Sequence, residues 1–292
     1  MRQNSLSFLT STLTRLAVAI LVLAIPALTH AQCRDTDFPG KDGIVAAPSR
    51  PVESSSPDPI QTGVAETEMG FTRSWVTSNS SQNALGNLVK LGAWCNVEIR
   101  WGVGSLLNNT VASSTNTGFG DNTLAGQYRF HRESAKIPSM AVGYMVKFPS
   151  ADPATGLGSG QTDHMVMLLL GKTVKKYSIV MNVNYFAIGQ PGGFYNHKSE
   201  FTLEVSRPLK GQWGVLGEVY YDSHLNATNA AYGNSTWGLT YTVNPRLVFD
   251  VGAYVGLSNG PGVPGNSLFF GVSYALGSLY GKPRRTPPVV AE

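Results

Sequence analysis

About a dozen segments of this chain alternate apolar with polar residues, and the connections between them are alternately short and long. Successive side chains of a β-strand point to opposite faces, so each segment would have one apolar and one polar face. In the first segment, Glu66, Glu68, Gly70, Thr72 and Ser74 share one face, and Thr67, Met69, Phe71, Arg73 and Trp75 share the other. The pattern predicts an all-β protein.

We place twelve strands on this pattern, at 66–75, 85–91, 97–103, 123–130, 138–147, 162–171, 178–185, 201–205, 212–222, 237–243, 246–257 and 267–276. Short connections are expected near Trp94 and at 131–137, 172–176, 208–211 and 244–245. Long connections are expected near Asn79 and at 106–117, 150–160, 189–198, 223–234 and 258–265. Short turns on one side and long loops on the other are typical of outer-membrane barrels.

The two faces distinguish a membrane barrel from a soluble sandwich, which also alternates. Trp and Tyr gather near the segment ends on the apolar face, as at Trp75, Tyr128 and Trp237, where amphipathic rings suit the membrane interfaces. The opposite face is rich in Gly, Ser, Thr, Asn and ionisable groups, which a sandwich core would not tolerate. The sequence therefore predicts a transmembrane antiparallel up-and-down β-barrel of about 12 strands, with both ends in the periplasm.

The rest of the chain divides at composition changes. Residues 1–31 carry Arg2, Arg15 and an apolar run too short for a spanning helix, which is typical of a secretory signal peptide. Gln32 stands before Cys33, where a lipoprotein would have a small residue. We expect an irregular periplasmic arm at 32–62, the barrel at 63–277, and a basic, Pro-rich periplasmic tail at 278–292.

Charge and localisation limit the partners. The net charge of +4 falls to about +2 when Arg2 and Arg15 leave with the signal peptide, which is too weak to indicate nucleic acid. We expect the outer membrane of a Gram-negative cell, with its lipid and a small-molecule solute as partners. The sequence indicates no oligomeric state.

The chain has two cysteines, Cys33 and Cys95. Export to an oxidising compartment permits a disulfide between them, and the expected topology places both on the periplasmic side. Two free thiols are the alternative, because a sequence does not fix the distance between their Cα atoms.

Ionisable residues on the polar faces are candidates for lining the lumen. Six of them lie on four neighbouring strands, three acids beside three bases, and would neutralise one another: Glu66, Glu68, Lys90, Glu98, Arg100 and Arg129. Glu204, Glu218 and Asp250 have no evident inward cation. Such an acidic wall would favour cations or neutral solutes over anions.

The interior of the barrel raises two further questions. Eight strands enclose only side chains or a small ligand, sixteen enclose an aqueous channel, and twelve fall between. The arm at 32–62 could fold into the pore as a plug, or it could be a disordered or rim-packed leader. We expect the leader.

Catalytic and cofactor sites are not evident. His197 and Ser199 are two residues apart and His224 follows Asp222 closely, but neither pair matches the phospholipase or omptin barrels, and polar loops explain them more simply. His131 and His164 lack the carboxylate or Cys spacing of a metal site. We predict no enzyme, no metal and no cofactor.

Several short motifs resemble a known family in their order and spacing: Arg50-Pro51, Ser56-Pro57, Gly63, Glu68-x-Gly70-Phe71, Glu98-x-Arg100, Gly118-Phe119-Gly120-Asp121, Lys147-Phe148-Pro149 and the run 156–163. The family is that of outer-membrane barrels labelled as transporters of the meta-pathway of phenol degradation. The resemblance implies an outer-membrane channel or transporter for aromatic or other hydrophobic compounds, and it supplies no catalytic or binding residues. A non-conducting structural or surface-presenting barrel is the alternative, and an outer-membrane hydrolase is a more distant one.

The chain departs from many such barrels at its carboxyl end. Those barrels often end on an aromatic residue that the assembly machinery recognises, whereas this chain continues past Leu276 to Glu292. We expect Gly271, Tyr274 and Leu276 to act as an internal version of that signal.

Overall fold

A computed structural model describes residues 33–40, 43–77, 80–224, 231–258 and 265–280. The predicted signal peptide and most of the predicted tail, at 281–292, lie outside the described residues. Contacts divide the chain into a short unit, residues 1–35, and a unit formed by residues 36–292. All strands of the described residues belong to the second unit.

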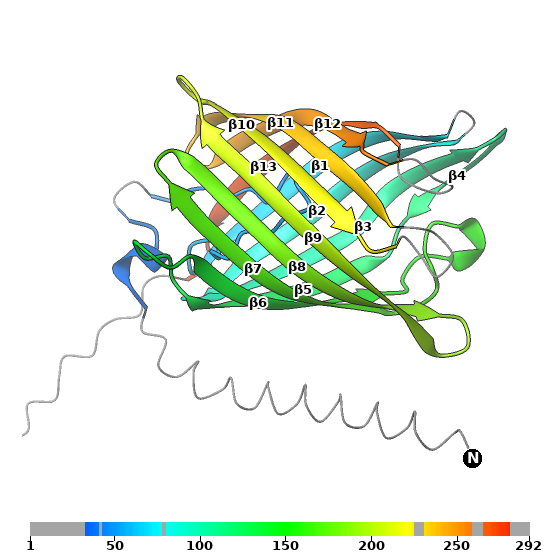
Figure 1. Ribbon diagram of the computed structural model, residues 1–292, viewed down its shortest axis with the longest axis horizontal. Coiled ribbons are helices and arrows are strands. Elements are labelled where there is room, and N and C mark those ends of the chain that lie inside the picture. The colour runs from blue at the N-terminus through cyan, green and yellow to red at the C-terminus, as the bar shows by residue number, and fades with distance from the viewer. Residues whose placement is uncertain (1–32, 41–42, 78–79, 225–230, 259–264, 281–292) are drawn as a thin grey trace, which may run out of the picture. The chain divides into compact units, whose positions relative to one another are not determined.

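Thirteen antiparallel strands form one sheet (Figure 1). Their bounds are β1 Val64–Thr77, β2 Ser80–Trp94, β3 Val97–Val111, β4 Ser114–Phe119, β5 Asn122–His131, β6 Ser139–Phe148, β7 Asp163–Val174, β8 Tyr177–Gln190, β9 Phe194–Pro208, β10 Trp213–Asp222, β11 Tyr232–Asn244, β12 Leu247–Gly256 and β13 Ser267–Ser278. Two 3₁₀ turns, η1 Asp35–Asp37 and η2 Pro153–Thr155, complete the regular structure of the described residues.

The sheet closes on itself, because β1 pairs with β13 from Val64↔Ser278 to Ser74↔Ser267. Strands β4 and β5 both pair with β3 and together count as one strand of the wall. Residues 106–111 of β3 pair with β4, and residues 97–102 pair with β5. The chain thus forms a closed 12-strand barrel, as predicted. Closure pairs β1 with β13, the two strands that an open sheet would leave with unpaired edges in lipid.

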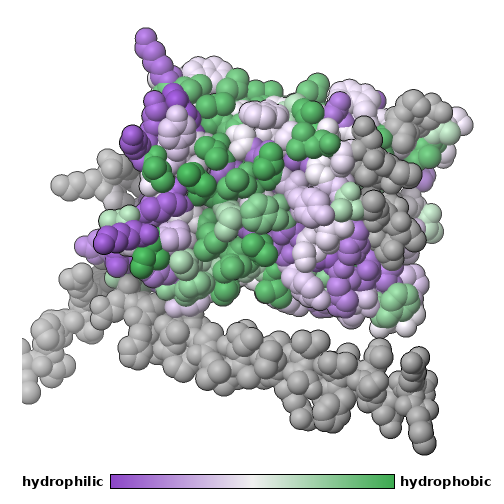
Figure 2. Space-filling view, viewed as in Figure 1, coloured by the Kyte–Doolittle hydropathy of each residue, from purple (hydrophilic) through white to green (hydrophobic). Residues whose placement is uncertain are grey.

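Large apolar side chains cover the outside of the barrel. Trp75, Phe201 and Leu239 would be buried between the sheets of a sandwich, but each is more than 40% exposed. Figure 2 shows hydrophobic residues gathered over the middle of the visible face, with hydrophilic residues towards both ends. This arrangement is that of a barrel wall facing lipid.

No helix among the described residues is long and apolar enough to cross a membrane.

Connections alternate as predicted, but several expected loops are regular. At one end, which we call the turn end, the connections include two-residue turns after Trp94 and Val174. At the other, the loop end, the expected loop at 106–117 is a β3–β4 hairpin, and that at 189–198 is the tip of a β8–β9 hairpin. Polar Asn and Thr side chains pair across the β3–β4 hairpin, so strand pairing continues where the apolar alternation stops.

Candidate functional site

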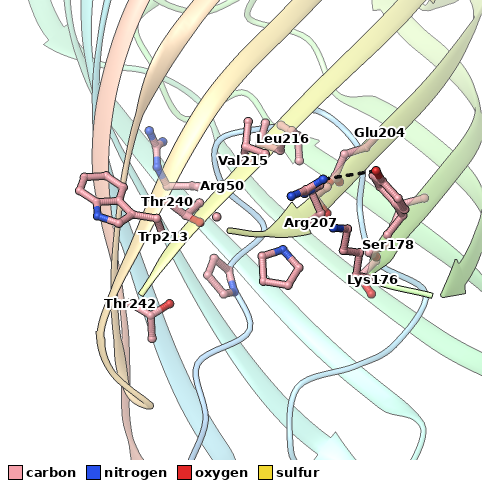
Figure 3. A pocket seen from close by; sticks show the side chains of 18 of the residues that line it. Arg50, Lys176, Ser178, Glu204, Arg207, Trp213, Val215, Leu216, Thr240 and Thr242 are labelled. Carbon is pink, nitrogen blue, oxygen red and sulfur yellow. Dashed lines mark hydrogen bonds between the residues drawn. The ribbon is translucent and has the colours of Figure 1, made fainter. Parts of the chain in front are cut away.

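The arm preceding β1 lies inside the barrel. Near its start the Ala46 N–H donates to the Pro245 carbonyl at the turn end, 2.7 Å away, and near its end the Thr62 N–H donates to the Asp37 carbonyl at 2.6 Å. Between these points the arm contacts inward-facing side chains around the whole barrel. The arm therefore enters and leaves at the turn end, and its tip crosses the lumen. The pale blue loop in Figure 3 shows this passage.

Lys90 joins the arm to the wall. Its ammonium lies 2.7 Å from Glu66 Oε1 and 2.6 Å from Glu68 Oε1, and all three side chains are at most 1% exposed. The same ammonium donates to the Ala47 carbonyl and to Ser49 Oγ. The two carboxylates in turn accept the backbone N–H groups of Ala47 and Ser49, both at 2.8 Å. One buried cation thus holds two strands and the arm together.

Arg50 crosses the lumen towards β12, where its guanidinium pairs with Asp250 at 3.4 Å. The guanidinium passes over Gly70 and Gly271. A Cβ at Gly70 would lie 1.9 Å from Arg50 Cζ, and one at Gly271 would lie 2.4 Å from Arg50 Nε. These two positions accept no side chain while the arm is in place. Glycine at 70 and 271 therefore provides the passage that Arg50 uses.

Backbone groups at the tip of the arm bind acids and amides of the opposite wall. The N–H groups of Glu53 and Ser54 donate to Glu218 at 3.0 and 2.7 Å, and Ser54 Oγ donates to Glu204 at 3.0 Å. The Ser55 backbone N–H and carbonyl bind the Asn182 amide, at 2.6 and 2.9 Å. Buried acceptors require such donors, so the wall is complementary to the arm.

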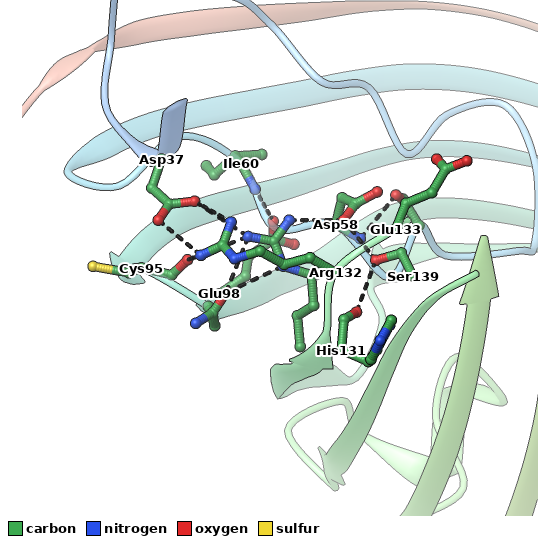
Figure 4. Close-up of polar contacts among 12 residues, drawn as sticks. Asp37, Asp58, Ile60, Cys95, Glu98, His131, Arg132, Glu133 and Ser139 are labelled. Atoms are coloured by element: carbon green, nitrogen blue, oxygen red, sulfur yellow. Dashed lines mark hydrogen bonds and ion pairs between the residues drawn. The ribbon is translucent and has the colours of Figure 1, made fainter. Parts of the chain in front are cut away.

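The returning part of the arm is held by arginines (Figure 4). Arg129 pairs with Asp58 at 2.7 Å and with Asp37 at 3.2 Å, and Arg132 binds Asp37 through two nitrogens at 2.5 and 2.8 Å. The Ile60 N–H donates to Glu98 at 2.7 Å. Paired, charge-assisted contacts of this kind are stronger than neutral hydrogen bonds.

These contacts correct three expectations. The described part of the arm is neither disordered nor confined to the rim. Arg129 pairs with Asp37 and Asp58 instead of with acids of the wall, whereas Lys90 with Glu66 and Glu68, and Arg100 with Glu98, do pair. Of the three acids expected to lack an inward cation, Asp250 does have one, Arg50 of the arm, whereas Glu204 and Glu218 accept neutral donors from the arm. An inventory of wall residues missed this because the partners lie outside the strands.

The arm divides the lumen into two parts. On the turn side it borders a cavity of about 920 Å³, lined by arm residues Arg50, Val52, Ser54 and Ser56 and by the ends of β7 to β11 (Figure 3). Glu204 and Lys176 also line this cavity. These four arm residues are every second residue of the tip. Glu53, which lies between two of them, faces the other part of the lumen. We call this cavity the turn-end cavity.

Towards the loop end, Glu53 is surrounded by ionisable wall residues. Its side chain is accessible within the lumen. The surrounding wall and arm nevertheless limit its contact with bulk water, and this desolvation, together with the nearby carboxylates of Glu200, Glu218 and Asp222, raises the pKa of Glu53 to about 8. Lys198 opposes this shift. The part of the lumen beyond the arm is therefore acidic.

Aromatic residues also face inward on this side, which the sequence did not lead us to expect. Phe269 and Tyr232 are 2% and 6% exposed. The rings of Tyr254 and Phe269 are 4.9 Å apart, and those of Tyr220 and Tyr232 are 6.3 Å apart. Strand parity alone would have placed these residues on the inner face, but the candidates for lining the lumen were all ionisable.

Of the cysteine and histidine candidates, Cys95 lies beside the arginines that hold the arm, because its carbonyl accepts from Arg129 and Arg132 at 3.5 and 3.4 Å. Neither cysteine is a free thiol, and Cys95 is 2% exposed. The pairing of Cys33 with Cys95 stays a prediction, and mass spectrometry of unreduced peptides would check it. His164 bonds to Tyr144, His197 to Tyr185 and His224 to Ser223. Among the described residues, no three His, Cys, Asp or Glu side chains are placed to bind one metal ion.

A family model described as putative MetA-pathway of phenol degradation matches residues 49–265. The chain belongs to this family. The match begins within the arm, at the residues that bind Glu68 and Asp250, and extends nearly to β13. No curated protein matches the chain.

One solved outer-membrane channel shares the fold, and two porins give weaker alignments. An outer membrane channel from Pseudomonas putida F1 aligns with 11% identity over 77% of this chain and 100% of its own, with a TM-score of 0.59. The KdgM porin in complex with disordered oligogalacturonate aligns with 10% identity over 71% and 98% of the two chains, at a TM-score of 0.48. The NanC porin gives 14% identity, 72% and 98% coverage, and a TM-score of 0.47.

Proposed function

We propose that this protein is an outer-membrane channel for small molecules, with aromatic or hydrophobic compounds as its solutes, and that its own arm is the gate. The single observation that carries the proposal is the arm itself, a segment of 43–62 that crosses the lumen. Polar contacts hold its tip, and Ala46 near its start packs against Val64, Val248 and Ala275. Water and ions can replace the polar contacts of the tip without exposing an apolar core. The arm is therefore suited to leave the lumen and return.

Three further features support the solute class and the orientation. The family is described by phenol degradation. Inward aromatic rings lie beyond the arm, where a ring of a solute could stack on them. Both barrel ends, Val64 and Ser278, lie at the turn end, which corresponds to the periplasmic side of outer-membrane barrels.

A non-conducting structural barrel is the competing function. A permanent plug would serve it, and the polar β3–β4 hairpin would present a surface. The turn-end cavity favours transport, because a barrel that only presents a surface has no need of an open space of about 920 Å³ against its plug.

Solute uptake tests the proposed function. We expect vesicles containing the purified protein to take up catechol faster than protein-free vesicles, and faster than they take up glucose or octanoate. Swelling rates measured by light scattering would give the comparison. Equal rates with and without a correctly folded barrel, verified by its heat-modifiable mobility in gels, would contradict transport.

A further inference from the structure

A patch on the inner wall of β8, β9 and β10 faces the lumen beyond the arm. It consists of Asn184, Lys198, Glu200, Thr202 and Asp222, and Glu53 of the arm approaches it; we call these six residues the β8–β10 patch. Cross-strand register places Asn184 opposite Glu200, and Glu200 opposite Asp222. Three carboxyl groups therefore lie beside one ammonium.

The contacts of Lys198 indicate which chemical group suits this patch. Its ammonium lies 2.7 Å from Asp222 Oδ1 and 4.5 Å from the centre of the Phe186 ring. A carboxylate together with an aromatic face is the chemistry that recognises an organic ammonium group. Glu200 has no cation of its own within ion-pair distance among the described residues, and its one hydrogen bond there is from the Asn184 amide, at 2.8 Å.

Two buried oxygens point independently to a missing donor. Thr202 is fully buried and Asn184 is 4% exposed, yet neither Thr202 Oγ1 nor Asn184 Oδ1 has a hydrogen-bond partner among the described residues. Both residues are inward-facing, and Thr202 follows Glu200 at the next inward position of β9. Buried acceptors without donors are uncommon and costly. A ligand with several N–H groups would satisfy them.

We propose that the β8–β10 patch binds the protonated amino group of a small aromatic amine. Glu200 and Asp222 would accept its N–H groups, Asn184 Oδ1 would accept another, and the neighbouring rings of Phe186 and Tyr220 would contact its aromatic part. The inference deepens the proposed function, since it names the solute class of the same lumen.

A matched series of ligands tests this proposal on the full-length protein. Tyramine, its neutral alcohol analogue tyrosol and the anion 4-hydroxyphenylacetate carry the same phenol ring. Isothermal titration of the protein in detergent should show tyramine binding about tenfold or more tighter than tyrosol, which is the effect of one charge-assisted hydrogen bond. Glu200→Gln should weaken tyramine by roughly tenfold and leave tyrosol unchanged. Glu133→Gln, at the turn end, is the control.

Each outcome decides the proposal. Equal binding of tyramine and tyrosol would overturn it, as would displacement of tyramine by K⁺ or Ca²⁺ at equal concentration, which would indicate a site for inorganic cations. If Glu200→Gln fails to fold, the ligand series on the unmodified chain still decides. Selective tyramine binding without uptake of any solute would contradict the channel and keep the site. Catechol uptake without a preference for tyramine over tyrosol would keep the channel and overturn the site.

Discussion

Removing the arm should convert the channel from rare, brief openings to a continuous open level. Deletion of residues 33–60 takes away the tip that binds Glu204, Glu218 and Asp250 from inside the lumen. The wall does not depend on the arm for closure, because β1 pairs with β13 along its length. Planar-bilayer recordings would measure the change, and we expect it to be the largest of any variant considered.

Two controls make the deletion interpretable. The deletion removes Cys33, so it should be compared with a full-length chain carrying Cys33→Ser and Cys95→Ser, and the deleted chain should carry Cys95→Ser. Deletion of residues 281–292 shortens the chain at the other end and should leave the recordings unchanged. A folded, arm-deleted barrel that stays silent would rule out the arm as the gate.

Replacing Lys90 by Met should cost the barrel about 3 to 5 kcal/mol of unfolding free energy. The substitution removes the cation between Glu66 and Glu68, whose side chains are fully buried, and leaves both carboxylates without compensation. It also removes the donor to the Ala47 carbonyl, so the arm should loosen as well. Urea unfolding in lipid vesicles, followed by tryptophan fluorescence, would measure the loss.

Two companion variants separate charge from packing. Lys176→Met alters an exposed lysine in the β7–β8 turn and should change stability by less than about 0.5 kcal/mol. Adding Glu66→Gln and Glu68→Gln to Lys90→Met removes the uncompensated charges and should restore much of the loss. A Lys90→Met barrel as stable as the unmodified one would contradict the arrangement of this cluster.

Strand periodicity was sufficient to predict the barrel, because lipid outside and water inside impose opposite residue types on the two faces. It also placed Glu66, Glu68 and Lys90 on one face of neighbouring strands, where the structure brings them together. Periodicity underestimated strand lengths where both faces are polar. The Asn and Thr pairs of the β3–β4 hairpin continue the ladder without any apolar alternation.

The position of the arm could not be read from periodicity, because the arm has none. One signal was nevertheless present. Glu204, Glu218 and Asp250 were inward acids without a cation in the strands, and buried acids require compensating donors. The Pro- and Ser-rich arm has free backbone N–H groups that no sheet uses, and Arg50 is a cation among them. Matching these inward acids against the unused donors of the arm would have placed the arm inside the barrel.

Tethering the arm tests the central claim most directly. In a Cys33→Ser, Cys95→Ser background, Ser54→Cys and Glu204→Cys place thiols on two residues whose side chains are 3.0 Å apart, and a short, reducible bis-thiosulfonate reagent would bridge them. Single-channel recording should show no openings while the bridge is intact and renewed openings after reduction. Identical conductance before and after reduction would contradict a lumen gated by its own arm.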